Sequence, residues 1–295
     1  MAKILPRVLP WLPSAKDDSD QLTRVLGRED TPALLAMLDK DPVSNIFLRA
    51  QVDQHGTAAP DGFARILAPS DPAQLVNACW VGANIVPTPM APSLAQIYAR
   101  RAMATRQRFA SVFGPSEAVM AMEPILARGS QQIFDVRPNQ PLLVMDDLSP
   151  VEPSPTLRPA TIDDFDAVLP ASAAMFEEEL GYSPLSSGGG YYRSRVRQML
   201  RNGHTFIDVD QYGEIIFKAD LGTVTSHATQ IQGVWINPRY RGQSLAANYM
   251  AAVVNHALTF APVVSLYVND YNEPALRTYE RVGFRQIGTF ATILF

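Results

Sequence analysis

The chain has 295 residues, of which 47% are apolar and 18% charged, and this balance excludes a disordered or fibrous protein. Its net charge is -4, so it has no global basic field with which to bind nucleic acid or an anionic lipid surface. An anionic ligand must therefore be held by a local site. The length suits two compact domains of about 140 residues each.

The N-terminal sequence favours a cytoplasmic protein. Residues 1–20 contain several prolines and the charged run 16–18, so the long apolar segment of a secretory signal is missing. No apolar stretch reaches the length that crosses a bilayer, and we expect no membrane partner. The single cysteine, Cys79, lies in an apolar run, which predicts a buried, unreactive thiol and excludes a disulfide within the chain.

The first half mixes helix and strand patterns. Residues 30–54 are predicted as helices and residues 64–68 and 76–81 as strands, followed by helix, strand and helix, and then by the strand-like run 142–145. Between these elements, residues 85–92 hold Pro87, Pro89 and Pro92, which have no backbone N–H to donate.

A proline-rich, acidic segment marks the boundary between two domains. Pro150, Pro153 and Pro155 stiffen this part of the chain and cannot donate to a sheet, which predicts an extended linker. We therefore divide the chain into an N-terminal domain of residues 1–145, a linker of residues 146–156 and a C-terminal domain of residues 157–295.

The second half has the predicted order βααβββαβαββ, which is α+β. Its expected elements are a strand at 157–160, helices starting at 161 and 191, strands at 205–210, 214–221 and 229–236, a helix at 244–260, a strand at 263–268, a helix at 274–282 and a strand pair at 285–288 and 289–295. The three consecutive strands are separated by turn residues, which indicates an antiparallel meander.

A strand, a tight loop and a helix follow one another at residues 234–260. Small residues at Gly242, Ser244 and Ala246 let backbone N–H groups approach a ligand, and the start of the helix adds unpaired donors and partial positive charge. This arrangement predicts a pyrophosphate site, although a glycine turn before an amphipathic helix explains the same residues.

A second motif follows the strand at 263–268. Asn272 can cap the helix that Pro274 helps to start, and Gly283 can end it. Tyr279 lies two turns after Asn272, so both side chains follow one face of the helix.

Together these segments resemble the GNAT superfamily of acyl-CoA N-acyltransferases. The acyl-CoA loop of that family has the form Arg/Gln-x-x-Gly-x-Gly/Ala, here Arg241-Gly242-Gln243-Ser244-Leu245-Ala246, with serine in place of the middle glycine. The second signature of the family matches at Asn272, Ala275, Tyr279, Gly283 and Phe284. The strong part of the resemblance covers about half the chain.

The resemblance implies acetyl-CoA as cosubstrate and a set of site residues. Val234 and Ile236 would offer backbone groups to pantetheine, and the Val234 N–H would stabilise the oxyanion while Tyr279 protonates the departing thiolate. The residues implied to bind the cofactor are Val234, Ile236, Arg241, Gly242, Gln243, Ser244, Leu245, Ala246, Asn272, Ala275 and Tyr279.

The closer resemblance is to a bacterial group of GNAT proteins with an additional N-terminal domain of unknown function. The first half resembles a GNAT fold in outline, but the prolines of residues 85–92 occupy the position of the phosphate loop, and no Asn and Tyr pair follows at residues 116–127. We therefore expect tandem GNAT-like domains, each a mixed, mostly antiparallel sheet flanked by helices, with a degenerate N-terminal copy.

The general base is not assigned by the sequence. The strand at 229–236 carries no glutamate, and Gln232 could orient a water without titrating. Among Glu177, Glu178 and Glu179, one could bind or deprotonate an ammonium group, although a solvated helix end explains them as well. The histidines show no metal-ligand spacing, so we predict no metal.

Three functions are compatible with these features. The leading one is direct transfer of an acetyl group to a primary amine of a small molecule or peptide. A non-catalytic acyl-CoA sensor with a protein partner is the alternative, because no base is evident. A Fem-like aminoacyltransferase that uses aminoacyl-tRNA is disfavoured by the acidic net charge and the intact CoA loop. We expect no nucleic acid partner, and a homodimer is compatible with the sequence.

Overall fold

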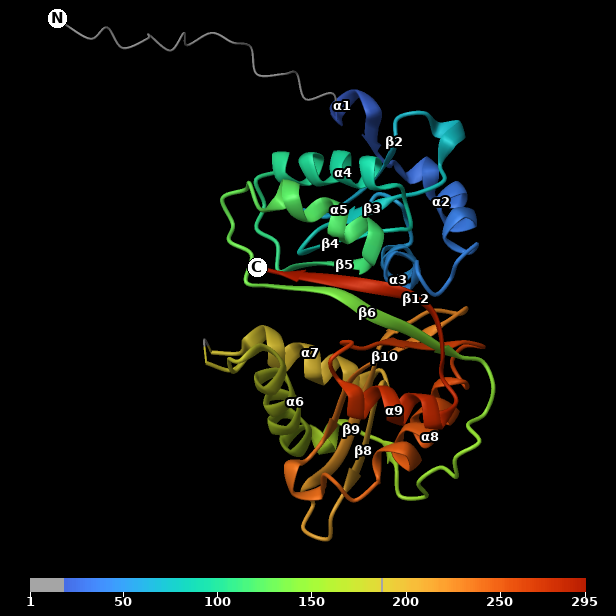
Figure 1. Ribbon diagram of the computed structural model, residues 1–295, viewed down its shortest axis with the longest axis vertical. Helices are drawn as coiled ribbons and strands as arrows, with labels where there is room; N and C mark the ends of the chain where they lie inside the picture. The colour runs from blue at the N-terminus through green and yellow to red at the C-terminus, as the bar shows by residue number, and fades with distance from the viewer. Residues whose placement is uncertain (1–18, 187) are drawn as a thin grey trace, which may run out of the picture.

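The computed structural model describes residues 19–186 and 188–295 (Figure 1). The expectations for residues 1–18, and for residue 187 in the glycine-rich loop, lie outside the described residues. Within the described ranges, no helix is long and apolar enough to cross a membrane.

Within the described residues, twelve strands form one sheet that runs through both halves of the chain, in the order β1-β2-β3-β4-β5-β12-β6-β11-β10-β9-β8-β7. The strands are β1 (Thr23–Val25), β2 (Arg65–Pro69), β3 (Cys79–Val81), β4 (Asn84–Pro87), β5 (Ser111–Pro115), β6 (Asp135–Met145), β7 (Arg158–Pro159), β8 (Thr205–Val209), β9 (Ile215–Val224), β10 (Thr229–Ile236), β11 (Val264–Tyr267) and β12 (Arg285–Leu294). The helices are α1 (Ser19–Leu22), α2 (Thr31–Leu38), α3 (Ile46–His55), α4 (Pro92–Ala104), α5 (Ser116–Leu126), α6 (Phe165–Leu180), α7 (Gly190–Arg201), α8 (Ala246–Ala257) and α9 (Glu273–Val282).

The two halves repeat one order of elements. The series β1-α2-α3-β2-β3-β4-α4-β5-α5-β6 corresponds step by step to β7-α6-α7-β8-β9-β10-α8-β11-α9-β12. In each half one strand pair is parallel, β4 with β5 and β10 with β11, and the other pairs within the half are antiparallel. The predicted fold class, tandem mixed sheets flanked by helices, is therefore confirmed.

The last strand of each half is exchanged into the sheet of the other. β6 pairs with β11, where Leu142 to Met145 lie opposite Val264 to Tyr267. β12 pairs with β5, where Phe290 to Leu294 lie opposite Ser111 to Pro115, and β6 and β12 also pair with each other. Figure 1 shows the two exchanged strands, green and red, side by side at the middle of the molecule.

The exchange extends to the hydrophobic cores. Leu143 and Met145 of β6 pack in the core of the second half with α8 and α9. Ala291 and Ile293 of β12 pack in the core of the first half with α4 and α5. Each core therefore includes a strand that the boundary at residue 145 assigns to the other domain. The domain boundaries proposed from the sequence remain a prediction.

Several elements differ from the sequence prediction, and two of the differences have a clear physical reason. Residues 285–294 form one strand rather than a pair, because the sheet accommodates the predicted break at Gly288 as a shift in register beside Gln286. Residues 84–87, expected in a loop, form β4; Pro87 is tolerated because it is the last residue of that strand.

Residues 146–156 contain no helix or strand and are held against the second half. The side-chain amide of Asn248 on α8 donates to the Glu152 carbonyl at 2.8 Å, and the Ser154 N–H returns a bond to the Asn248 carbonyl at 2.9 Å. The Ser149 hydroxyl donates to the carbonyl of Val282 at the end of α9. These bonds guide the chain from β6 to β7 over the surface of α8 and α9.

The strand exchange predicts that residues 150–295 do not fold alone. Without β6, the edges of β11 and β12 lose their partners and Leu143 and Met145 leave an open core, so we expect an aggregated or unfolded fragment by circular dichroism and size exclusion. Coexpression with residues 1–149 is expected to restore a one-to-one complex, with the intact chain as control. A soluble, cooperatively unfolding 150–295 monomer would contradict the exchange.

Candidate active site

A cleft opens where β10 and β11 separate. The two strands pair only at Thr229 with Val264 and at Gln230 with Ser265, and beyond these residues their facing edges diverge. The cleft has a volume of about 1250 Å³ and is lined from both halves of the chain. The predicted site residues that line it are Val234, Ile236, Arg241, Asn272 and Tyr279.

A bulge in β10 lies at the mouth of this divergence. Gln232 and Trp235 oppose Asp220 and Lys218 of β9, so Gly233 and Val234 share the space of one partner residue. Gly233 takes a positive φ of 61°, which glycine adopts at no steric cost. The bulge therefore removes Val234 from regular pairing with β9, while the β11 side of the strand is open to a ligand.

The predicted pyrophosphate loop connects this strand to α8. Gly242 and Ser244 both have positive φ, 76° and 61°. Leu245 precedes α8, and no side chain caps its N-terminus. The first N–H groups of the helix, at Ala246 and the residues after it, have no acceptor within the helix and suit an anion.

The left-handed backbone conformation at Ser244 explains why the family has glycine at this position. A residue with a Cβ pays about 1–2 kcal/mol in the left-handed region, and Ser244 is one of two non-glycine residues with positive φ among those described. Serine in place of the family's glycine therefore strains the local backbone and also adds a side chain.

Arg241 forms an ion pair with Glu178 of α6, and both residues line the cleft. Its guanidinium donates to both carboxylate oxygens of Glu178, at 3.0 and 2.7 Å, and its Nε donates to the Ile236 carbonyl at 2.9 Å. Glu178 also accepts from the Trp235 indole N–H at 3.1 Å. The Arg241 and Glu178 side chains are each almost half exposed, and such pairs are worth only about 0–1 kcal/mol, so a phosphate can displace the contact.

Tyr279 lines the cleft from α9. The residue is 7% exposed, its ring meets the Phe284 ring edge-on, and burial raises its pKa to about 12. The hydroxyl therefore keeps its proton at neutral pH. It can donate to an anion in the cleft, and it cannot act as a base there.

The α9 helix that carries Tyr279 is bounded as the sequence predicts. The Asn272 side chain accepts from the Ala275 N–H at 3.3 Å, and Gly283 ends the helix with a φ of 113°. The Gly283 and Phe284 N–H groups both donate to the Tyr279 carbonyl. Asn272 and Ala275 thus fix the helix start, and Asn272 lies at the cleft.

The first half contributes cleft residues that the sequence analysis missed. Arg137 of β6, 8% exposed, donates to Asp135 at 3.0 Å and to Glu179 of α6 at 2.7 Å, and so joins α6 to the first half. Gln140 donates to Asn269 at 2.8 Å at the same wall. The polar residues within β6 were a signal in the sequence, but they did not indicate which strands β6 would lie beside.

The three adjacent glutamates predicted near the acceptor site have separate positions. Glu178 and Glu179 are held in the ion pairs with Arg241 and Arg137, and both line the cleft. Glu177 is exposed at the end of α6, where its carbonyl accepts from the Gly181 N–H. Gln232 also lines the cleft and packs against Gly222.

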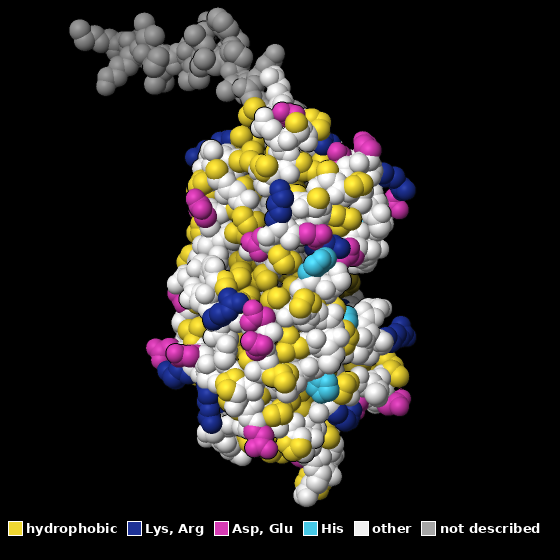
Figure 2. Space-filling model, turned by 90° about the vertical axis from the view of Figure 1, so that its right-hand side faces the viewer, with side chains coloured by type: hydrophobic (Ala, Val, Ile, Leu, Met, Phe, Trp, Pro, Cys, Tyr) yellow, Lys and Arg dark blue, Asp and Glu magenta, His cyan; other side chains and the backbone are white. Residues whose placement is uncertain are grey.

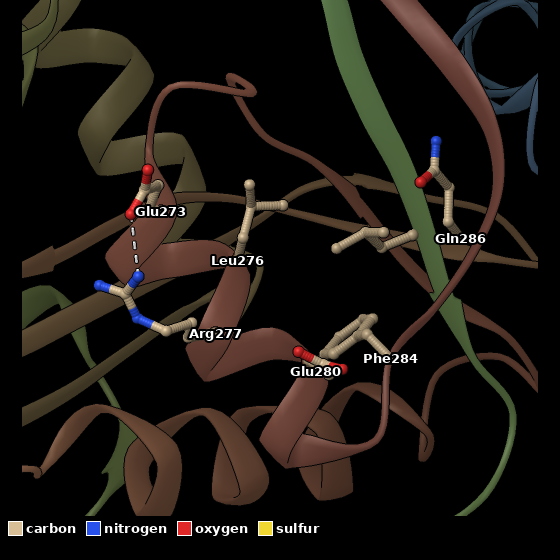
Figure 3. Close-up of a pocket in the computed structure, with 7 residues that line it drawn as sticks. Glu273, Leu276, Arg277, Glu280, Phe284 and Gln286 are labelled. Carbon is tan, nitrogen blue, oxygen red and sulfur yellow. Dashed lines mark hydrogen bonds and ion pairs between the residues drawn. The ribbon is translucent and has the colours of Figure 1, made fainter.

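A smaller hollow of about 410 Å³ lies between α9 and the strands β6 and β12 (Figure 3). Its polar side chains include Glu273 and Arg277, which form an ion pair with each other at 3.0 Å, and Leu276 points from the helix toward β6. It contains none of the predicted site residues. We therefore place the chemistry in the larger cleft.

Charge and histidine placement give no competing site in the described residues. Basic and acidic side chains are interspersed on the face shown in Figure 2. His204 and His256 pack against Phe260 and Phe206, and burial lowers the pKa of both histidines. Across residues 19–186 and 188–295, no three His, Cys, Asp or Glu side chains gather in a way that could hold a metal ion.

Comparison with known proteins identifies two regions of the chain. Residues 172–284 match the acetyltransferase (GNAT) family, and residues 64–168 match a domain of unknown function, DUF4081. Comparison with curated proteins gives no match. The chain therefore contains a GNAT acetyltransferase domain at residues 172–284, with a DUF4081 domain before it.

Solved structures share the whole two-part architecture. A GNAT acetyltransferase from Colwellia psychrerythraea is 13% identical, with a TM-score of 0.57 over 92% of this chain and 99% of that one. A GCN5-related N-acetyltransferase from Sphaerobacter thermophilus is 16% identical, with a TM-score of 0.59 over 92% and 94%. A tandem GNAT protein from the clavulanic acid biosynthesis pathway is 13% identical, with a TM-score of 0.54 over 92% and 97%. At these identities the likeness shows the fold alone.

The strain at Ser244 predicts opposite effects of two substitutions. Ser244→Gly removes the Cβ from the left-handed position and is expected to raise the free energy of unfolding by up to about 1 kcal/mol. Ser244→Val places a β-branched side chain there and is expected to lower it and to weaken acetyl-CoA binding. Chemical denaturation and calorimetry measure both effects. A valine variant with the stability and CoA affinity of the glycine variant would contradict a left-handed residue 244.

Proposed function

We propose that this chain moves an acetyl group from acetyl-CoA directly to a primary amine. Acyl transfer in general follows from the GNAT family match. The observation that carries the finer proposal is one cleft that holds the opened strand at Val234, the loop at Arg241 and the protonated hydroxyl of Tyr279. These are the groups that a thioester, a pyrophosphate and a leaving thiolate require.

The cofactor is proposed to lie from the α8 N-terminus to the β10 bulge. Backbone N–H groups from Gly242 to Ala246 would hold the pyrophosphate, with Gln243 and Leu245 as the intervening residues of the loop. Pantetheine would then extend along Ile236 and Val234. This requires Arg241 to leave the Ile236 carbonyl, which the small worth of its exposed ion pair permits.

The chemistry needs three events at the bulge. The neutral amine attacks the thioester carbon, the carbonyl oxygen becomes negative, and the carbon–sulfur bond then breaks. We assign the Val234 N–H to the oxyanion and the Tyr279 hydroxyl to the departing thiolate, because both lie in the cleft and Tyr279 holds its proton at neutral pH.

The first half is proposed to bind no CoA. β4 keeps regular pairing with β3 and has no bulge, and α4 begins at Pro92, where a backbone donor is missing. Its proposed role is to wall the acceptor end of the cleft, where Asn84, Ser111 and Phe113 face the second half. The acceptor class is a small-molecule or peptide amine.

Mass spectrometry of the intact protein with acetyl-CoA and a panel of amines tests the proposal. The panel contains a polyamine, an aminoglycoside, an amino acid amide and a lysine peptide, and formation of an acetylated amine with release of CoA is the expected result. CoA binding without any product would overturn catalysis and leave a non-catalytic acyl-CoA sensor.

The loop assignment predicts one CoA per chain and its loss in Gly242→Pro. Gly242 has a φ of 76°, which proline cannot adopt, so the loop and its donors are displaced. Calorimetry with acetyl-CoA should give a stoichiometry of one for the intact chain and no binding for the variant. Gly62→Pro, at another exposed positive-φ glycine, is the matched control and should bind normally. Two CoA molecules per chain would refute the degenerate first half.

The proton donor is tested by Tyr279→Phe. The described residues provide no hydrogen-bond partner for this hydroxyl, so its removal leaves stability and CoA affinity near wild type, while kcat is expected to fall by about 100-fold or more. Tyr249→Phe is the control, because that hydroxyl donates to Asp208 away from the cleft and its loss should affect stability rather than turnover. Full turnover of Tyr279→Phe would exclude Tyr279 as the acid.

A further inference from the structure

A buried ion pair lies directly beneath the β10 bulge. Lys218 of β9 is 1% exposed, its ammonium group donates to Asp220, and the same group lies 3.5 Å from the Gly233 carbonyl. A buried ammonium group is unfavourable unless it is paired and hydrogen-bonded, so Lys218 requires this carboxylate. The pair is thus a fixed part of the strand that faces the bulge.

Asp220, unlike Lys218, reaches the cleft. Its side chain is 14% exposed and the residue lines the cleft, whereas Lys218 is enclosed behind it. Its Oδ1 accepts from the Thr205 hydroxyl at 2.8 Å, and a Cβ built on Gly233 would lie 3.0 Å from its Oδ2. The carboxylate is therefore held on two sides, next to the residue that precedes Val234.

From this geometry we infer that Asp220 is the proton acceptor for the amine substrate. The inference rests on the proposed acetyl transfer, and it fills the role that the sequence left unassigned. Asp220 is oriented by Lys218 and Thr205, stands at the bulge where the thioester carbonyl would lie, and is open to the cleft from which an amine enters.

The proton balance of the reaction requires such a group. An ammonium substrate begins with three protons on nitrogen, and the amide product keeps one. Of the other two, one ends on the sulfur of CoA, and the other leaves to solvent. Asp220 takes the proton that goes to solvent and so generates the lone pair that forms the carbon–nitrogen bond as the carbon–sulfur bond breaks.

Glu178 and Glu179, which also line the cleft, are engaged in ion pairs of their own. Glu178 is bound by Arg241 and Trp235, and Glu179 is bound by Arg137. The titratable groups that face Asp220 are Lys218 on its own strand, Tyr192 on α7 and His204 before β8. Burial, and then the Asp220 charge, raise the pKa of Tyr192 to about 12, while burial lowers that of His204, opposed by Asp220.

The test must separate a catalytic carboxylate from a counterion for Lys218. Asp220→Asn alone strands a buried ammonium group, so the decisive variant is the intact chain with Lys218→Met and Asp220→Asn together, which removes both charges. Asp208→Asn is the matched control, because Asp208 is a buried carboxylate on β8 that bonds Tyr249 outside the cleft. All chains are assayed with acetyl-CoA and the panel of amines.

The double variant is expected to fold, to bind acetyl-CoA as wild type does, and to lose about 100-fold or more in kcat. Its kcat/KM should rise by roughly tenfold per pH unit until the amine itself deprotonates, since only a neutral amine can then react. Turnover within a few-fold of wild type would overturn the inference and leave the pair as structural. Failure of the proposed function is a different result, namely no acetylated amine from the wild-type chain.

Asp220→Glu keeps both charges and covers the case in which the double variant does not fold. The carboxylate moves by one methylene, so a base that needs its present position loses about tenfold or more in kcat at an unchanged melting temperature. A counterion for Lys218 tolerates the move. Wild-type kcat and an unchanged pH profile in this variant would overturn the assignment.

Discussion

The pairing of β6 with β12 at the centre of the sheet is the constraint on which the rest of the molecule depends. Each strand comes from one half and closes the core of the other, so neither half completes its sheet from its own sequence. This reciprocal exchange also fixes the cleft. β6 carries Arg137 and Gln140 to the wall that faces α6 and β11, and so the first half becomes part of the cleft.

Within the second half, a single bulge organises the polar groups. Gly233 with its positive φ opens β10, and the same residue leaves room above the Lys218 and Asp220 side chains, because any Cβ there would crowd Asp220 and Met175. A buried lysine in a strand is costly, and its presence here is explained by a carboxylate that must be held in one orientation. The backbone bulge of β10 and the buried ion pair of β9 therefore lie next to each other in the sheet.

The sequence predicted many of the local elements well. Asn272 and Gly283 bound α9 through capping interactions between near neighbours, which residue types alone can indicate. The exchange of β6 and β12 was not predictable, because an apolar run such as residues 142–145 does not specify which strand it will pair with. The sequence did contain a signal for Asp220. Lys218 and Asp220 lie two residues apart, so these opposite charges share one face of a strand that is otherwise largely apolar.

The phosphate loop shows how stability and binding are balanced at this site. Ser244 is held in a left-handed conformation, no side chain caps α8, and Arg241 is engaged by Glu178 and Ile236 rather than by a stronger, buried partner. The uncapped helix start leaves backbone donors unpaired, and the exposed ion pair holds the Arg241 charge only weakly. The pyrophosphate that we propose here would accept from the helix start and from the loop and would replace Glu178 as the anion next to Arg241. On this proposal the strain at Ser244 is offset by ligand binding rather than by contacts within the protein.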